Sequence, residues 1–147
     1  MEQLRVPLAG DTLARVHAEE CATAAVLAAV GIAVDGFAAA GETLSGDVVL
    51  RRRSGEQIHL EALQRSVVLE LVPGGPLPAT LAVGEDELRL PVTVRPVTCD
   101  PHVLAETKQP FVFPLLVQVG DGEAVAVDLP LSGAQRAQLQ ELLGRVC

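Results

Sequence analysis

The stretch "FVFPLLVQVGDGEAVAVDL", residues 111–129, is the strongest local indication of the fold in this sequence. Two runs rich in Val, Leu and Phe flank Gly120-Asp121-Gly122, and glycine next to aspartate is typical of tight turns between antiparallel strands. In the second run Val125 and Val127 alternate with smaller or polar residues, as in a strand with one buried face. The segment therefore predicts a β-hairpin.

Similar short apolar segments, separated by glycine and proline, occupy much of the remaining chain. Residues 86–97, "DELRLPVTVRPV", alternate most clearly, and Pro91 predicts that this strand lies at a sheet edge. Proline and glycine at residues 73–78 exclude regular structure there. Short strands at roughly 10-residue spacing favour an antiparallel sandwich or barrel, and here an immunoglobulin-like β-sandwich is expected. Three further strands are predicted, over residues 3–8, 43–53 and 65–72.

Two segments predict helices. At the C-terminal end, Ser132 can cap a helix and Gln135 completes a capping box. Residues 10–24, "GDTLARVHAEECATA", are a weaker candidate with Asp11 as the cap. The first of these helices has a single apolar stripe that would pack on the sandwich, formed by Leu139, Leu142, Leu143 and Val146.

Composition and charge exclude several classes of function. A chain of 147 residues has room for one domain with a real core, and with three Phe and no Trp or Tyr that core must be aliphatic. The formal net charge of -8 repels polyphosphate and anionic lipid. Residues 21–34 form the longest apolar run, which is too short for a transmembrane helix, and no signal peptide is evident. We therefore expect no cofactor, no nucleic-acid partner and no membrane insertion.

The two ends of the chain repeat one plan. Residues 5–21, "RVPLAGDTLARVHAEEC", and residues 127–147, "VDLPLSGAQRAQLQELLGRVC", each contain Pro-Leu, a small residue, a glycine, a helical stretch and a final cysteine. Two copies of one domain ending would produce this pattern. We therefore predict that residues 1–25 are the strand-helix tail of a preceding sandwich-like domain, and that residues 26–147 form the sandwich with its C-terminal helix.

Residues 95–115, "RPVTCDPHVLAETKQPFVFPL", together with "LARVHAEECA" at residues 13–22, resemble a group of proteins from GC-rich bacteria. Members of that group consist of two tandem immunoglobulin-like sandwiches and carry a Cys-Asp-Pro-His motif near the final hairpin. The resemblance implies the same fold, a tandem domain as partner, and an extracellular or cell-envelope location. It implies no activity.

The cysteines and histidines allow three interpretations. His17 with Cys21 and Cys99 with His102 have spacings of four and three, so a Cys2His2 zinc site is possible if the two segments meet. Cys99 and His102 could also form a catalytic dyad, but no third orienting residue or oxyanion hole accompanies them. Pro101 instead favours a rigid turn in which Asp100 caps a short helical segment.

The third interpretation is a disulfide, and it follows from the internal repeat. If each copy ends in a helix whose last cysteine returns to the sandwich, Cys147 pairs with Cys99. The loop thus closed, of about 50 residues, would contribute roughly 4 kcal/mol in the chain-entropy model. Cys21 would then be the unpaired thiol of an odd set of three.

Two charged clusters have structural interpretations. Residues 51–53 are three arginines, which could bind an anion or an acidic partner. Because the net charge is negative, we expect them instead to be a solvated rim that protects a strand edge. On that interpretation Arg52→Ala changes stability by no more than about 0.5 kcal/mol. The acidic residues 85–87 lack the spacing of a calcium loop and predict an exposed turn.

These patterns together favour a protein without enzymatic activity, namely a structural or interaction module. The alternative is a small zinc-binding protein that uses His17, Cys21, Cys99 and His102.

Overall fold

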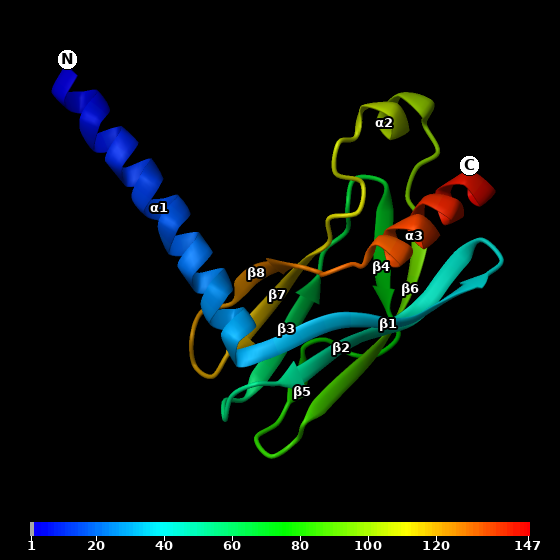
Figure 1. Cartoon of the computed structure of the whole chain (residues 1–147), viewed down its shortest axis with the longest axis horizontal. Helices are drawn as coiled ribbons and strands as arrows, with labels where there is room; N and C mark the ends of the chain where they lie inside the picture. Colours follow the sequence, from blue (N-terminus) through cyan, green and yellow to red (C-terminus); the bar gives the residue numbers. More distant parts are fainter. Residues whose placement is uncertain (1) are drawn as a thin grey trace.

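The structure, a computed structural model, describes residues 2–147, with side chains from Thr12 onward. It is mainly β, with a long helix at the N-terminal end and a shorter one at the C-terminal end (Figure 1). The helices are α1 (Glu2–Ala29), α2 (Pro101–Glu106) and α3 (Gly133–Val146). The strands are β1 (Val30–Ala40), β2 (Thr43–Arg52), β3 (Ile58–Leu63), β4 (Leu69–Pro73), β5 (Ala79–Leu81), β6 (Glu87–Pro96), β7 (Pro114–Val119) and β8 (Val125–Asp128).

The strands form two antiparallel sheets of four strands each. One sheet has the order β1-β2-β6-β4 and the other has the order β5-β3-β7-β8. The hairpin predicted from residues 111–129 is confirmed as β7 and β8, with Leu115 opposite Val127 and Val117 opposite Val125. The two-sheet arrangement confirms the coarse prediction of an antiparallel, sandwich-like fold.

The core lies between the sheets and is aliphatic, as the composition requires. Phe113 is its largest fully buried side chain, and leucine and valine supply most of the remainder. Each sheet buries every second side chain of its strands, and apolar residues therefore alternate with polar ones in the sequence. Fully buried examples from the strands are Val48 and Leu50 of β2, Leu60 of β3, Leu69 of β4, Val94 of β6 and Leu115 of β7.

The prediction that β6 is an edge strand was wrong, because β6 lies between β2 and β4. Pro91 is tolerated there because its backbone faces the end of a neighbour. The carbonyl of Pro91 accepts from the amide of Gly74 at 2.7 Å, just after β4 ends at Pro73. In an antiparallel strand the amide and carbonyl of one residue face the same side. The amide that proline lacks would therefore face Gly74, which lies just after β4. The hydrogen bonds between the paired residues of β4 and β6 are all kept.

The predicted strand over residues 3–8 was also wrong. These residues belong to α1, a 28-residue helix, and residues 10–24 continue the same helix, so residue 11 is not at its start. The side chain of Asp11, the expected cap, lies outside the described residues. The interpretation of residues 1–25 as a domain tail stays a prediction, but its strand-helix form is replaced by one continuous helix.

The junction between α1 and β1 has no loop, and Arg53 explains how the helix ends there. The Arg53 side chain donates to the carbonyl of Leu27 at 2.9 Å, and its amide donates to the carbonyl of Ala29 at 3.0 Å. Both are carbonyls of the last helical turn, which otherwise lack partners. β-branched Val30 and Ile32 then favour a strand. The sequence change and Arg53 together convert helix to strand within one residue.

The C-terminal helix α3 is confirmed with its capping box and its buried stripe. The Ser132 side chain accepts from the Gln135 amide, and the Gln135 side chain accepts from the Ser132 amide. Leu139, Leu142 and Leu143 are buried. The helix also lies over the outer edge of β1 and the turn that follows it, and its polar side chains donate to backbone carbonyls there. These contacts are Gln135 to Val34 at 2.8 Å, Gln138 to Phe37 at 3.1 Å and Arg145 to Gly41 at 2.9 Å.

Candidate functional site

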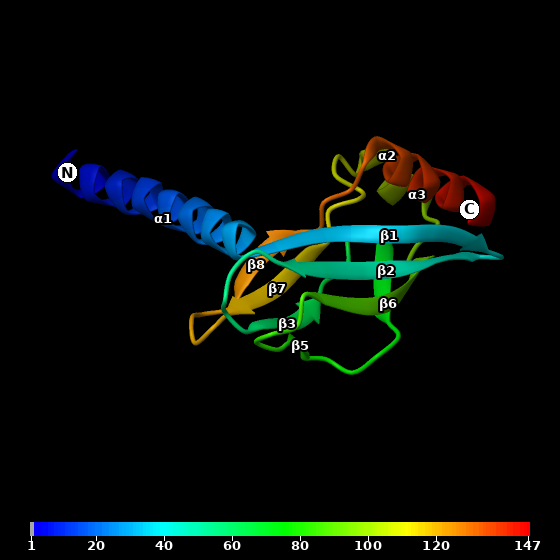
Figure 2. The ribbon, with the colours of Figure 1, turned by 60° about the horizontal axis from the view of Figure 1, so that its bottom comes forward.

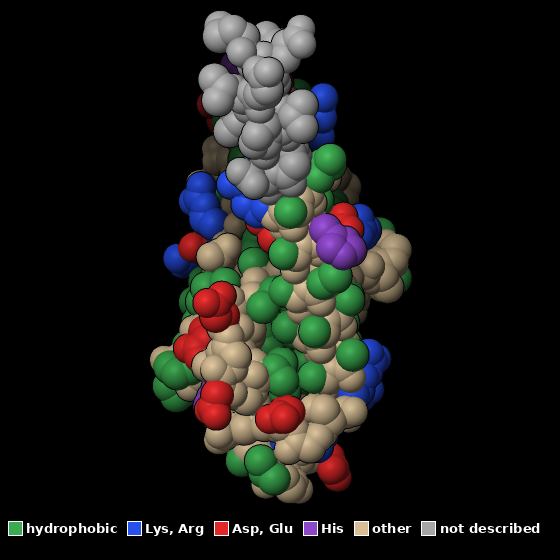
Figure 3. Space-filling model, turned by 90° about the vertical axis from the view of Figure 1, so that its left-hand side faces the viewer, with side chains coloured by type: hydrophobic (Ala, Val, Ile, Leu, Met, Phe, Trp, Pro, Cys, Tyr) green, Lys and Arg blue, Asp and Glu red, His purple; other side chains and the backbone are tan. Residues whose placement is uncertain are grey.

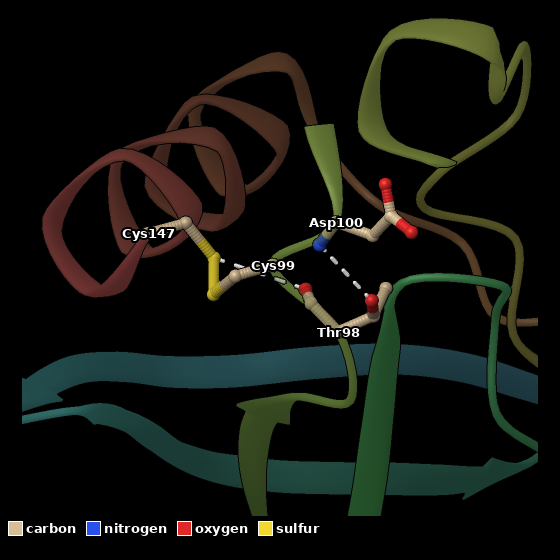
Figure 4. Close-up of a disulfide and its surroundings, with 4 residues drawn as sticks. All are labelled: Thr98, Cys99, Asp100 and Cys147. Carbon is tan, nitrogen blue, oxygen red and sulfur yellow. Dashed lines mark hydrogen bonds between the residues drawn. A yellow bond between two sulfur atoms is a disulfide. The ribbon is translucent and has the colours of Figure 1, made fainter. Parts of the chain in front are cut away.

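The disulfide between Cys99 and Cys147 is present, with Cα atoms 5.3 Å apart and a sequence separation of 48 residues (Figure 4). It joins the last residue of the chain, directly after α3, to the loop that follows β6. The Cys147 sulfur also lies 3.8 Å from the carbonyl of Thr98. The bond holds the end of α3 against the sheets and leaves Cys99 no free thiol for catalysis or metal binding.

The remaining residues of the Cys-Asp-Pro-His motif start the short helix α2. The Asp100 carboxylate accepts from the His102 amide at 2.9 Å, and Pro101 occupies the first helical position. Proline suits that position because the amide it lacks would have no helical partner. His102 is exposed. The motif therefore builds a bend, as the turn interpretation predicted.

The four residues of the zinc alternative do not come together. His17 and Cys21 lie one turn apart on α1, with the Cys21 sulfur 3.5 Å from the His17 ring, whereas His102 is on α2. Cys99 is already bonded to Cys147. Across the described residues no group of three or more His, Cys, Asp or Glu side chains could hold a metal ion. The Cys2His2 interpretation is therefore replaced by the disulfide.

The solvated rim expected at residues 51–53 was wrong for Arg52. The Arg52 guanidinium is half-buried and donates to the backbone carbonyls of Glu85 at 2.6 Å and Ser54 at 2.9 Å. It also donates to the carbonyls of Ala82 and Glu56. Moreover, β2 is an internal strand, so it has no edge to protect. Arg52 joins the loop after β2 to the turn between β5 and β6.

The neighbouring charges form an exposed network across three strands. Glu87 accepts from Arg51 and Arg89, each at 3.0 Å, and Arg89 also contacts Asp35 at 3.0 Å and Asp47 at 3.4 Å. The hydrogen bond from Arg51, followed by that from Arg89, lowers the pKa of Glu87. The hydrogen bonds to Glu87 and then to Asp35 raise the pKa of Arg89. This network lies on the exposed surface of the sheet.

A groove of about 1040 Å³ lies between α1 and β8. The helix contributes residues between Arg15 and Leu27, and the other wall is residues 123–124, just before β8, with the first two residues of β8. Only the last turns of α1 pack on the sheets, because Val26 and Ala29 are its buried side chains in the described part of the helix. The rest of the helix extends away from both sheets (Figures 1 and 2).

The side chains that line the groove are mostly apolar, and most of its charged ones are acidic. Small side chains leave the space, namely Ala18, Ala22 and Ala24 on α1 and Ala124 and Ala126 on the β8 side. Glu19, Glu20 and Glu123 also line it, against one basic residue, Arg15. Among the described residues these three glutamates form no ion pair. Figure 3 shows this end of the molecule, with hydrophobic side chains gathered together and acidic ones beside them.

The residues of α1 divide into a groove face and an opposite face. At 100° per residue, Glu19 and Thr23 lie at the centre of the groove face, whereas Cys21 and Ala28 lie on the opposite side. Leu13 and Val16, which are 71% and 47% exposed, add apolar surface to the part of the helix that projects. Because Cys21 lies on the opposite side of the helix, its free thiol is outside the groove.

Comparison of the chain with protein-family models, with curated proteins and with solved structures found no match. Among the described residues no helix is both long and apolar enough to cross a bilayer. The residues of the groove were not predicted from sequence. The hairpin and the alanine-rich run at residues 21–34 were both recognised, but nothing local indicates that the helix would stand beside β8.

Proposed function

We propose that this chain is an immunoglobulin-like interaction module without enzymatic activity, which binds a protein partner in the groove between α1 and β8. The observation that carries the proposal is the groove itself. A 28-residue helix held to the sheets by its last turns leaves one face open toward a strand edge. An exposed apolar surface rimmed by polar residues is typical of a protein-binding site.

The strand order supports the immunoglobulin-like part of the proposal. Constant-type immunoglobulin domains place strands A, B, E and D in one sheet and C, F and G in the other. The order β1-β2-β6-β4 corresponds to the first sheet, and β3-β7-β8 corresponds to the second. The short strand β5 is an addition at the edge next to β3. Neither β2 nor β7 contains the cysteine that joins the sheets of antibody domains, and the disulfide here ties down α3 instead.

The resemblance to tandem sandwich proteins of GC-rich bacteria is consistent with such a role. In a tandem protein the neighbouring domain, or another protein, would supply the partner. That the chain has no enzymatic activity remains part of the proposal. Sandwich folds carry many unrelated functions, and only a specific site is evidence for a particular function.

The proposal is tested by selecting ligands and then blocking the groove. The full chain, with its disulfide intact, is used to select from a displayed library of random linear heptapeptides. Selected peptides are measured against Ala22→Trp, which fills the groove, and against Ala28→Trp, which adds the same side chain outside it. Thermal unfolding of both variants verifies that they fold.

We expect Ala22→Trp to weaken binding at least about tenfold, which is 1.4 kcal/mol, and Ala28→Trp to leave it unchanged. A library that yields no binder contradicts the proposal. Equal binding by the two variants contradicts it as well.

A further inference from the structure

We propose that the partner of the groove is a basic, extended peptide segment that adds as a fifth strand to the free edge of β8. This inference rests on the proposed function, because it names the partner of the same groove. Three features of the molecule carry it: the direction of the β8 backbone, the state of the other sheet edges and the charge of the groove.

The backbone of β8 offers unpaired hydrogen-bonding groups to the groove. The amide of Leu129 donates to the carbonyl of Phe113 at 2.9 Å, so Leu129 faces β7. Because facing directions alternate along an antiparallel pair, Val127 and Val125 also face β7. Ala126 and Asp128 therefore direct their amides and carbonyls outward. Within the described part of the chain β8 has no strand on that side. An extended peptide can pair with these groups.

The other edges are closed or lack a groove. The outer edge of β1 is covered by α3 through the side chains of Gln135 and Gln138. β5 has three residues, and β4 ends in Pro73, which cannot donate to a new strand. The edge of β8 contains no proline, and the groove lies at its first two residues, Val125 and Ala126. An arriving strand would find backbone partners on β8 and apolar contacts on α1.

The charge of the groove selects a basic segment over a second copy of this chain. Its lining carries Glu19, Glu20 and Glu123 against Arg15, and these glutamates form no ion pairs within the described residues. A second copy would bring another net charge of -8. Lysine or arginine on the incoming strand would instead meet the free carboxylates, which favours encounter and register.

Two substitutions at one position test strand addition directly. Ala126→Pro removes an outward-facing amide while it leaves the bonds to β7 in place, and Ala126→Ser retains that amide. The probe is the synthetic heptapeptide of highest affinity from the selection above, measured by isothermal titration calorimetry. We expect Ala126→Pro to bind at least about tenfold more weakly than Ala126→Ser, because both variants change the side chain and only proline removes the amide.

A second measurement does not depend on the folding of a variant. The same heptapeptide is synthesised with each backbone amide methylated in turn. If it binds as a strand, affinity falls at alternate positions, because only every second amide faces β8. A loss without this two-residue period overturns strand addition. So does wild-type affinity for Ala126→Pro.

The charge part of the inference has its own readout. We expect the selected peptides to be enriched in Lys and Arg, and the double variant Glu19→Gln/Glu123→Gln to weaken binding several-fold and to reduce its salt dependence. Neutral or acidic selected peptides overturn this part. Sedimentation of the free chain as a dimer that Ala126→Pro dissociates would assign the edge to a second copy instead.

The outcomes separate this inference from the proposed function. If Ala22→Trp abolishes binding while Ala126→Pro and the methylation series show no strand pairing, the groove is a binding site and only the mode of binding is wrong. If neither Ala22→Trp nor Ala126→Pro affects the peptides, the proposed function fails.

Discussion

The guanidinium of Arg52 holds together two loops that are far apart along the chain. From the sequence it is one of three adjacent arginines, and nothing local distinguishes it from Arg51 or Arg53. In the fold each has a different role. Arg51 pairs with Glu87 at the surface, Arg52 binds several carbonyls, and Arg53 caps the end of α1. Their positions on β2 and in the loop after it decide these roles, because successive side chains on a strand face opposite sides.

We predict that Arg52→Ala destabilises the protein by about 2–3 kcal/mol, because carbonyls that now accept from a charged group lose their partner. Arg51→Ala is the matched control and should cost less than about 1 kcal/mol, since its ion pair is exposed. Urea unfolding of both variants measures the difference. Equal and small losses would restore the interpretation of a solvated rim.

The exposed network around Glu87 predicts a dependence on pH. Arg51, and then Arg89, lowers the pKa of Glu87 below its ordinary value of 4.5. A carboxylate with a depressed folded-state pKa stabilises the fold above its unfolded pKa, and the contribution is lost as the pH falls through the folded value. We expect Glu87→Gln to lower the melting temperature at pH 6, and the difference from wild type to shrink below about pH 4.

Asp86→Asn is the control for this series, because the Asp86 side chain is exposed and forms no ion pair among the described residues. Its melting temperature should follow that of the wild type at each pH. A Glu87→Gln effect that stays constant down to pH 3 would show that the ion pairs contribute nothing to stability.

At the scale of elements, α3 shows a helix whose local and tertiary signals agree. Its capping box, its apolar stripe and its final cysteine are all readable from the sequence, and each has the contact it requires. By contrast, α1 has weak periodicity, and its position depends on Arg53 and on the two buried residues Val26 and Ala29.

We predict that Leu142→Ala costs about 2–5 kcal/mol, because the side chain is fully buried between α3 and the sheets. Arg136→Ala, an exposed position on the same helix, is the control and should change stability by less than about 0.5 kcal/mol. The unfolding midpoint in urea reports both. An unchanged midpoint for Leu142→Ala would show that α3 is not packed.

The disulfide gives the second prediction at this scale. Peptide mapping without reduction should recover Cys99 linked to Cys147, while Cys21 reacts with an alkylating agent in the native protein. Reduction should destabilise the fold by about 4 kcal/mol in the chain-entropy model for a loop of this length. Cys21→Ser should respond to reductant as the wild type does. If all three thiols label freely in oxidised native protein, the disulfide is absent.

At the scale of the whole molecule, the projecting part of α1 contributes to the groove and little to the stability of the sheets. The side chains from Thr12 to Glu20 are exposed, whereas the helix is anchored by Val26 and Ala29. The molecule thus divides into a packed two-sheet body and a helical arm. This division is what leaves the β8 edge accessible.

We predict that removal of residues 1–20 leaves the unfolding free energy of the body within about 1 kcal/mol of the full chain, because the described side chains removed are exposed. Peptides selected by the full chain should lose binding to the shortened one, since part of the groove wall is gone. Urea unfolding and calorimetry test the two statements. Loss of folding would mean that the arm is part of the core.

The sequence by itself determined the features that arise from local chemistry. Alternating valines and a Gly-Asp-Gly turn specify the β7–β8 hairpin, Ser132 and Gln135 specify the start of α3, and Asp100 with Pro101 specifies α2. The repeat of the two chain ends predicted the Cys99–Cys147 pairing, although residues 3–8 are helical and not the strand that the repeat implied.

Only the tertiary structure decided which strands are internal, what Arg52 binds and where the groove lies. Pro91 suggested an edge strand because proline lacks the amide that an internal strand needs. The sequence does not show that β4 ends at Pro73, so that the missing amide has no partner on β4. Arg52 meets carbonyls up to 33 residues away. The groove requires α1 to stand beside an edge strand more than 90 residues later, as with Glu20 and residue 123. Contacts between distant segments depend on how whole elements pack, and no local pattern encodes that arrangement.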